Sequence, residues 1–178
     1  PETGERPPLK ISVNYFEVDP YAIPGYRQFV GIFERVAKGN PNHPRFFENG
    51  LKELDNRERV SVFAFEDYNT TGLSGEDDDP NSTFSACVLS EGTSNKEDKT
   101  AGGSYGIGKN AIYGFSKVRT VFYSSMNAQG EYIFQGLAKL ACWEDELDET
   151  RADRIYFGKG DKCNSIRDMN DLPTQSAD

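Results

Sequence analysis

Hydrophobic positions divide the first half of the chain into two strands and two helices. Residues 9–18 (LKISVNYFEV) and 59–66 (RVSVFAFE) are rich in β-branched and aromatic side chains with partial alternation, so both are predicted strands. Between them, residues 25–38 and 45–54 place apolar side chains at helical spacing. A Gly-Asn-Pro sequence at 39–41 predicts the break between these two helices.

A long polar stretch separates this half from a second group of apolar segments. Residues 74–102 contain two charged clusters and one short predicted helix, at 82–89. Gly136, within the strand predicted at 132–142, is expected to form a β-bulge. Both element types occur without an internal repeat, so residues 1–178 are predicted to form a single α+β domain. Beyond the polar stretch, the pattern predicts one helix and then three strands, at 110–116, 118–124, 132–142 and 154–157.

Charge and composition narrow the possible partners. The formal net charge is −9, which argues against a nucleic-acid-binding surface in this segment but leaves nucleotide binding open. The 3 cysteines form no CxxC pair and the single histidine is His43, so neither a disulfide framework nor a zinc site is predicted. No apolar run is long enough to cross a bilayer, and residues 1–8 lack the apolar core of a signal peptide. These features predict a cytoplasmic protein without a membrane partner.

Three glycines and a lysine at residues 103–109 (GSYGIGK) form the clearest candidate for a ligand site. Glycine lets consecutive backbone N–H groups form a concave anion site, so the segment is predicted to bind phosphate. It matches the first part of a P-loop, but Asn110 replaces the Ser or Thr that binds magnesium there. The residues before it are also too polar for the buried strand that precedes a P-loop. A P-loop is therefore disfavoured.

Three segments in a fixed order favour a different phosphate loop. Residues 67–73 (DYNTTGL) follow a predicted strand, residues 90–93 (SEGT) lie in the polar stretch, and residues 103–125 contain the glycine loop, a helix and a strand. They resemble the D-x-G-x-G motif, the lid and the glycine box of the Hsp90, gyrase, histidine kinase and MutL (GHKL) ATPases. Residues 67–73 are one residue too long and lack the first glycine, so the resemblance is to a divergent bacterial branch.

The resemblance implies a Bergerat-type two-layer α/β sandwich with a mixed, mainly antiparallel sheet, incomplete at both ends. It also implies a helical insertion at 20–57, an ATP lid at 74–102, and ATP and Mg²⁺ as cofactors. In this arrangement Asp67 accepts a hydrogen bond from the adenine amino group; taken alone, Asp67 is better explained by an Asx turn. The residues implied to bind ATP are Asp67, Asn69, Thr70, Gly72, Ser90, Gly92, Thr93, Gly103, Ser104, Tyr105, Gly106, Ile107, Gly108 and Lys109.

Two elements of a GHKL ATPase are missing from the sequence. The family carries a water-activating Glu and, four residues later, a magnesium-binding Asn on a helix before the first strand. No such pair precedes Asp67, and no Gly-Thr strand follows Asp161. We therefore expect the chain to be an internal piece of a longer protein, and the catalytic residues stay unknown.

Three functions remain open from the sequence. In the first, the domain binds Mg-ATP and couples binding or hydrolysis, through lid closure, to partner or dimer contacts. The resemblance to the divergent bacterial branch implies a role in anti-phage defence. Hydrolysis would require the helix with the Glu and Asn in the full-length protein. The alternatives are a nucleotide-binding module that does not hydrolyse and a structural interaction domain whose glycines serve turns.

Overall fold

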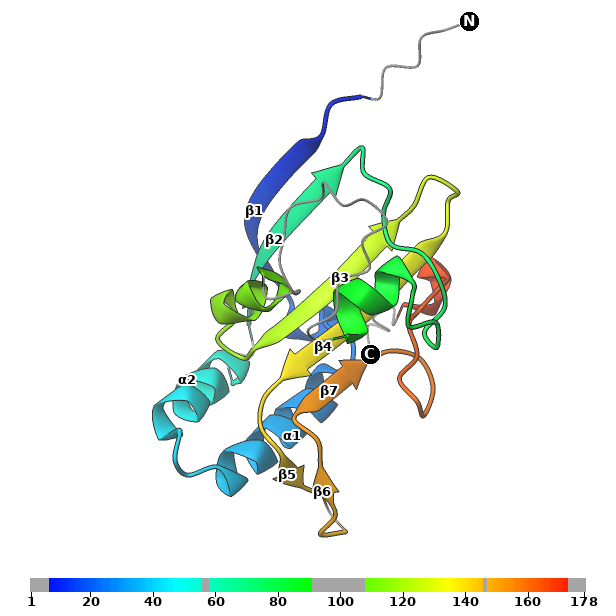
Figure 1. Ribbon diagram of the computed structural model, residues 1–178. Coiled ribbons are helices and arrows are strands. Elements are labelled where there is room, and N and C mark those ends of the chain that lie inside the picture. The colour runs from blue at the N-terminus through cyan, green and yellow to red at the C-terminus, as the bar shows by residue number, and fades with distance from the viewer. Residues whose placement is uncertain (1–6, 56–57, 91–107, 146, 173–178) are drawn as a thin grey trace, which may run out of the picture.

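The computed structural model describes residues 7–55, 58–90, 108–145 and 147–172 (Figure 1). Helices and strands are both present, which confirms the predicted α+β class. The longer elements are β1 (Lys10–Val18), α1 (Tyr26–Gly39), α2 (Pro44–Leu54), β2 (Val60–Tyr68), β3 (Thr120–Met126), β4 (Tyr132–Lys139) and β7 (Arg154–Phe157). The shorter ones are η1 (Pro20–Ala22), η2 (Ser85–Leu89), η3 (Gly108–Phe115), β5 (Trp143–Glu144), β6 (Thr150–Arg151) and η4 (Met169–Asp171).

Every strand pairing among the described residues is antiparallel. β1 pairs with β2, β3 and β7 flank β4 in a second sheet, and β5 pairs with β6. β2 and β3 run in the same direction, since their arrowheads point the same way in Figure 1. Their C-terminal ends are tied together, because the backbone N–H of Leu73 donates to Ser125 Oγ at 2.9 Å.

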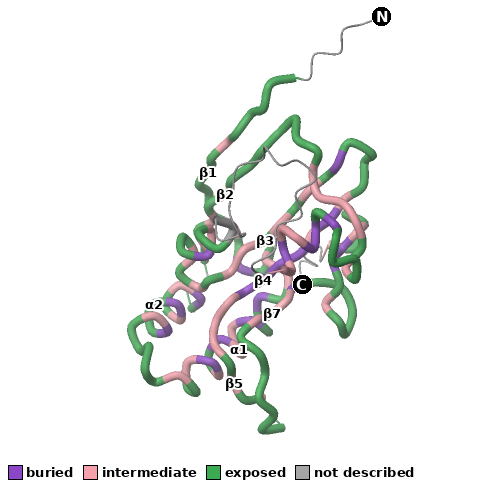
Figure 2. The backbone as a smooth tube through the Cα atoms, viewed as in Figure 1, coloured by how far each residue is buried: buried purple, intermediate pink, exposed green. Residues whose placement is uncertain are grey.

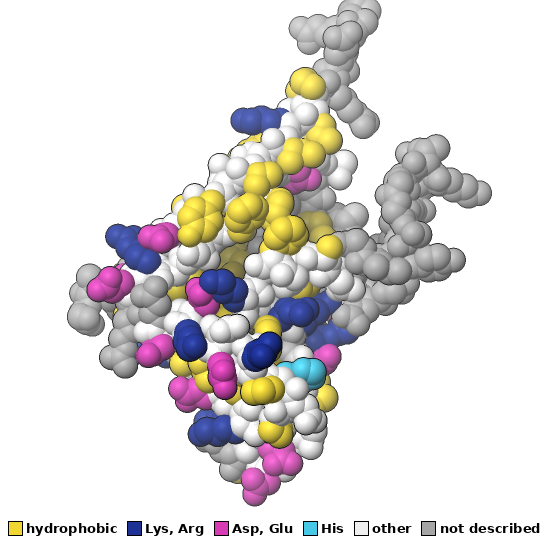
Figure 3. All heavy atoms as spheres, turned by 90° about the vertical axis from the view of Figure 1, so that its left-hand side faces the viewer, with side chains coloured by type: hydrophobic (Ala, Val, Ile, Leu, Met, Phe, Trp, Pro, Cys, Tyr) yellow, Lys and Arg dark blue, Asp and Glu magenta, His cyan; other side chains and the backbone are white. Residues whose placement is uncertain are grey.

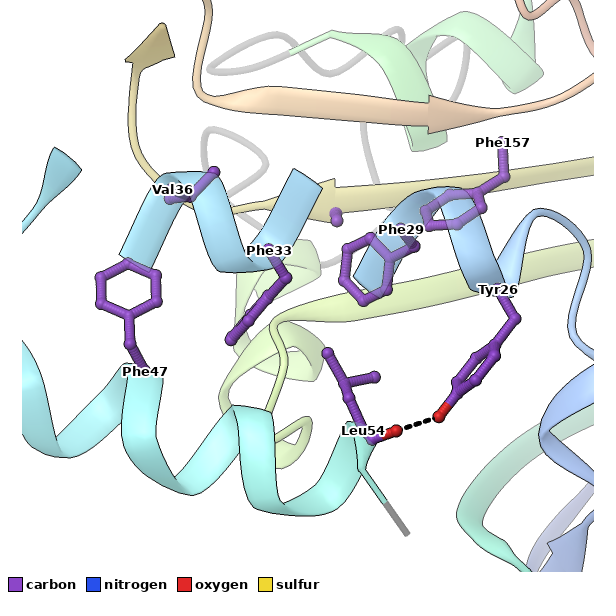
Figure 4. Close-up of a cluster of buried hydrophobic side chains, with 8 residues drawn as sticks. Tyr26, Phe29, Phe33, Val36, Phe47, Leu54 and Phe157 are labelled. Carbon is purple, nitrogen blue, oxygen red and sulfur yellow. Dashed lines mark hydrogen bonds between the residues drawn. The ribbon is translucent and has the colours of Figure 1, made fainter. Parts of the chain in front are cut away.

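The two long helices form the main hydrophobic core with one face of the larger sheet. Phe33 and Val36 of α1 are fully buried, and Phe47 and Leu54 of α2 are nearly so. Figure 4 shows these side chains pointing toward one another, with Phe157 of β7 closing the cluster. The hydroxyl of Tyr26 donates to the carbonyl of Leu54, which joins the start of α1 to the end of α2.

The opposite face of the larger sheet is covered by η2 and η3. Phe84 and Val88 of the η2 segment pack on Ile133 of β4. The hydroxyls of Tyr113 in η3 and Tyr123 in β3 lie 3.2 Å apart, and burial raises the pKa of both. β4 is therefore buried on both faces, as the purple tube at the centre of Figure 2 shows. The described part of the predicted lid, residues 74–90, is packed onto the sheet through η2.

The bulge expected at Gly136 is not formed. The β3–β4 register runs without interruption from Thr120↔Ala138 to Met126↔Tyr132. Gly136 instead makes room for aromatic rings, because a Cβ there would lie 2.6 Å from the Phe122 ring and 2.8 Å from Phe157 Cβ. The glycine signal in the sequence therefore reflects close packing across the sheet rather than an extra residue in the ladder.

Replacing Gly136 with Ala is expected to lower the free energy of unfolding by about 1–3 kcal/mol, the typical cost of overpacking. Gly31 of α1 is the control, because a Cβ there meets nothing within 4 Å and alanine favours helix. Urea denaturation of both variants measures the effect. A Gly136→Ala variant as stable as the parent would show that Phe122 and Phe157 repack freely.

Asp77 anchors the start of the polar stretch to the C-terminal segment. Its carboxylate accepts hydrogen bonds from the Ser165 backbone N–H at 2.7 Å, from the Ser165 hydroxyl, and from the Arg167 guanidinium at 2.8 Å. Burial alone would raise the pKa of Asp77, but these bonds and the Arg167 charge hold that pKa below its ordinary value. The anchor fixes the described part of the predicted lid at its N-terminal side.

Replacing Asp77 with Asn is expected to cost about 1–3 kcal/mol of stability at neutral pH. A carboxyl group whose pKa is lower in the folded state stabilises that state above its unfolded pKa. This contribution is lost as the pH falls through the folded pKa, which lies below 3.8. The stability difference between parent and variant should therefore shrink in acid, measured by urea denaturation across that range. A difference independent of pH would contradict the role of the Asp77 charge.

Candidate functional site

A cavity of about 720 Å³ separates β2 from β3. All nine residues of β2 line it, together with Thr120, Val121, Phe122 and Ser124 of β3. Successive strand residues point to opposite faces, so a cavity lined by all of them runs along the strand edge. Its volume falls within the range of small-molecule sites in proteins.

Aromatic rings form one wall of this cavity. Phe115, at the end of η3, stacks on Phe63 with ring centroids 6.3 Å apart and an interplanar angle of 11°. It also contacts Phe65 at 5.7 Å. The exposed fractions of Phe115, Phe63 and Phe65 are 69%, 51% and 45%, so much of their surface stays available to a ligand. Flat rings of this kind can stack on a planar base.

Asp67 is placed on the same face of β2 as these rings. It follows Phe65 by two residues, and the β1–β2 register sets it opposite Ile11. Among the described residues the Asp67 carboxylate has no hydrogen bond or ion pair, so the Asx turn that would explain Asp67 is not formed. Its carboxylate is exposed and lines the cavity.

The neighbouring carboxylates of the cavity are already engaged. Glu66 lies on the other face of β2 and accepts a hydrogen bond from Asn14 Nδ2 at 2.6 Å, and its charge raises the pKa of the Tyr68 hydroxyl. Glu53 pairs with Lys117 at the opposite end of the cavity. Asp67 is thus the cavity carboxylate available to an incoming donor, within the part of the chain that the structure describes.

Four other predicted site residues lie outside the cavity lining, and three of them have local contacts of their own. Asn69 has a φ of 66° and donates from Nδ2 to the Pro8 carbonyl at 2.7 Å. Gly72 has a φ of +70°, and a Cβ there would lie 2.9 Å from Asn127 Cα. The backbone N–H of Ser90 closes η2 by donating to Ser85 at 2.8 Å. Thr70 is exposed in the bend that follows β2. The structure does not bring these four together with Asp67.

Most of the predicted phosphate loop lies outside the part of the chain that the structure describes. Gly92, Thr93 and the segment 103–107 (Gly103, Ser104, Tyr105, Gly106 and Ile107) lie outside the described residues. Gly108 and Lys109 open η3, which ends at Phe115, whose ring contacts Phe63 of β2. The backbone that leaves the glycine loop therefore continues directly into the aromatic wall of the cavity.

Lys139 supplies a cation next to Asn110, the residue that follows this loop. The sequence alone did not reveal this lysine as a neighbour of the loop. Its Nζ donates to Asn110 Oδ1 at 2.7 Å and lies 4.6 Å from the centroid of the Tyr113 ring. Lys139 ends β4, 29 residues after Asn110, so no motif connects the two. Strand pairing beneath η3 brings it to the first turn of that helix.

The described residues contain no group of three His, Cys, Asp or Glu side chains suited to a metal ion. None of the helices in this same part of the chain is both long and apolar enough to cross a membrane. In comparisons with known proteins, no family model, no curated protein and no solved structure matches the chain.

Proposed function

We propose that this domain binds an adenine nucleotide, with the base in the cavity between β2 and β3. The observation that carries the proposal is the position of Asp67, whose unengaged carboxylate shares one face and one cavity with Phe63, Phe65 and Phe115. A carboxylate accepts hydrogen bonds only, which suits the exocyclic amino group of adenine. The rings supply the stacking surface for the base.

The phosphates are assigned to the glycine loop at 103–109 and to the lysines near it. The loop leads into η3, whose first turn lies next to Lys139, and ammonium groups form charge-assisted hydrogen bonds with phosphate oxygens. The described residues offer no metal-binding cluster, so we assign no side chain to Mg²⁺. That ion is commonly held largely by the phosphates and water.

The same proposal includes the Bergerat-type sandwich with a mixed sheet. It is supported by the common direction of β2 and β3, whose edges face each other across the cavity. It is also supported by the placement of α1 and α2, inserted between β1 and β2, on one face of the larger sheet. We propose binding rather than hydrolysis for this segment, because Glu53 and Glu66 are engaged by Lys117 and Asn14.

Titration of the protein with Mg-ATP in a calorimeter tests this function. Replacing Gly106 with Val fills the predicted anion site, so the dissociation constant should rise about tenfold or more. Gly39→Val is the control, because a Cβ at Gly39 meets nothing within 4 Å at the end of α1. ATP binding unchanged by Gly106→Val would reject the phosphate loop, and absence of ATP binding to the parent would reject the function.

A further inference from the structure

The outer edge of β1 is open along its whole length. Among the described residues β1 pairs with β2 only, from Lys10↔Tyr68 to Val18↔Val60 without a bulge. Ile11, Val13 and Tyr15 lie on one face of the strand, with exposed fractions of 68%, 55% and 64%. Figure 3, which views the β1 side of the molecule, shows hydrophobic side chains gathered over this region.

Natural proteins protect such an edge with proline, a bulge, a short strand or charges along it. β1 has nine residues, contains no proline, and carries its only charged side chains, Lys10 and Glu17, near its two ends. A long, regular and apolar edge of this kind is a template for pairing with another strand.

We propose that a second copy of this chain pairs with β1 in antiparallel fashion, about a two-fold axis at Val13. Residues directly opposite in an antiparallel pair share a face of the sheet. When a strand pairs with its own copy, opposite residues must therefore both have odd numbers or both have even numbers. The register centred on Val13 fulfils this condition. It sets Val13 opposite Val13, Ile11 opposite Tyr15, and Ser12 opposite Asn14 of the other copy.

The sequence of β1 is complementary to itself in this register. On one face Val13 meets Val13 and Ile11 meets Tyr15, and on the other face Ser12 meets Asn14 and Lys10 lies opposite Phe16. The antiparallel arrangement brings the Lys10 end of one copy to the Glu17 end of the other. Because Lys10 and Glu17 are its only charged residues, β1 is electrically neutral in a chain of net charge −9. Pairing here does not bring like charges together. The backbone edge offered for pairing is the one that faces away from β2, while the side chain of Tyr15 also lines the cavity between β2 and β3.

Sedimentation equilibrium over a range of protein concentrations tests the proposal with paired variants. The parent should form dimers, and both Val13→Lys and Val13→Glu should raise the dimer dissociation constant about tenfold, because each sets like charges opposite one another at the axis. Mixing the two variants should restore dimers, since Lys then faces Glu. Val13 is half exposed, so circular dichroism should show both variants folded.

Leu147→Lys is the matched control, because Leu147 is 77% exposed and lies outside β1. This variant should dimerise like the parent. A monomeric parent at all concentrations would overturn the proposal, as would single variants that dimerise normally. Charge variants that remain monomeric when mixed would contradict the register at Val13 and the proposal with it.

Discussion

Replacing Asp67 with Ala is expected to weaken ATP binding about 10- to 100-fold. Hydrogen bonds to a charged group typically contribute about 1.5–3 kcal/mol, and about 1.4 kcal/mol corresponds to a tenfold change in affinity. The Asp67 carboxylate has no internal partner among the described residues, so its removal leaves no buried group unsatisfied in the free protein. The loss should therefore appear in binding, measured by calorimetric titration, with little change in stability.

Glu66→Ala is the matched control for this prediction. It removes a carboxylate from the next position of β2, but Glu66 lies on the other face and contacts Asn14. A charge that acts only at long range is screened by salt, so the ATP dissociation constant should change less than about threefold. Equal losses of affinity in the two variants would show that net charge matters and that Asp67 has no specific contact with the base.

Replacing Phe33 with Ala is expected to lower the free energy of unfolding by about 3–5 kcal/mol. Phe33 is 0% exposed and forms edge-to-face or tilted ring contacts with Phe29, Phe46 and Phe47. Its ring also lies against Gly50 of α2, where an added Cβ would come within 2.4 Å. The truncation leaves a cavity between α1 and α2, measured by urea denaturation.

Phe115→Ala provides the opposite case for comparison. Phe115 is 69% exposed, so its truncation should cost less than about 1 kcal/mol of stability. It removes a stacking surface of the cavity, however, and should weaken ATP binding about tenfold. A large stability loss with unchanged ATP affinity would assign Phe115 to the core and not to the site.

Segments with a clear period were predictable from the sequence. The strands at β1, β2 and β7, the helices α1 and α2, and the short helices η2 and η3 were all expected close to their observed bounds. β4 ends at Lys139 instead of residue 142, and β5 and β6 were not foreseen. Two-residue strands are too short to show alternation, and their pairing depends on the hairpin that joins them.

In the candidate site, only a residue whose position follows from the pattern of its own strand could be predicted from the sequence. Asp67 could be identified because it lies near the end of a periodic apolar strand. Asn69 and Gly72 have positive φ angles and local contacts, which a motif cannot distinguish from ligand binding. Phe115 lines the cavity, and Lys139 contacts Asn110, only because η3 packs against the sheet, a long-range feature that leaves no local signal in the sequence. The cytoplasmic location and the link to anti-phage defence stay predictions.

The central claim is that Asp67 recognises the amino group of adenine in the cavity beside β2. Inosine triphosphate tests it most directly, because its base has a carbonyl oxygen in place of that amino group, together with a hydrogen on N1. The ratio of the inosine triphosphate to the ATP dissociation constant should be about ten or more for the parent and close to one for Asp67→Ala. Equal affinity of the parent for both nucleotides, or the same ratio in parent and variant, would contradict the account.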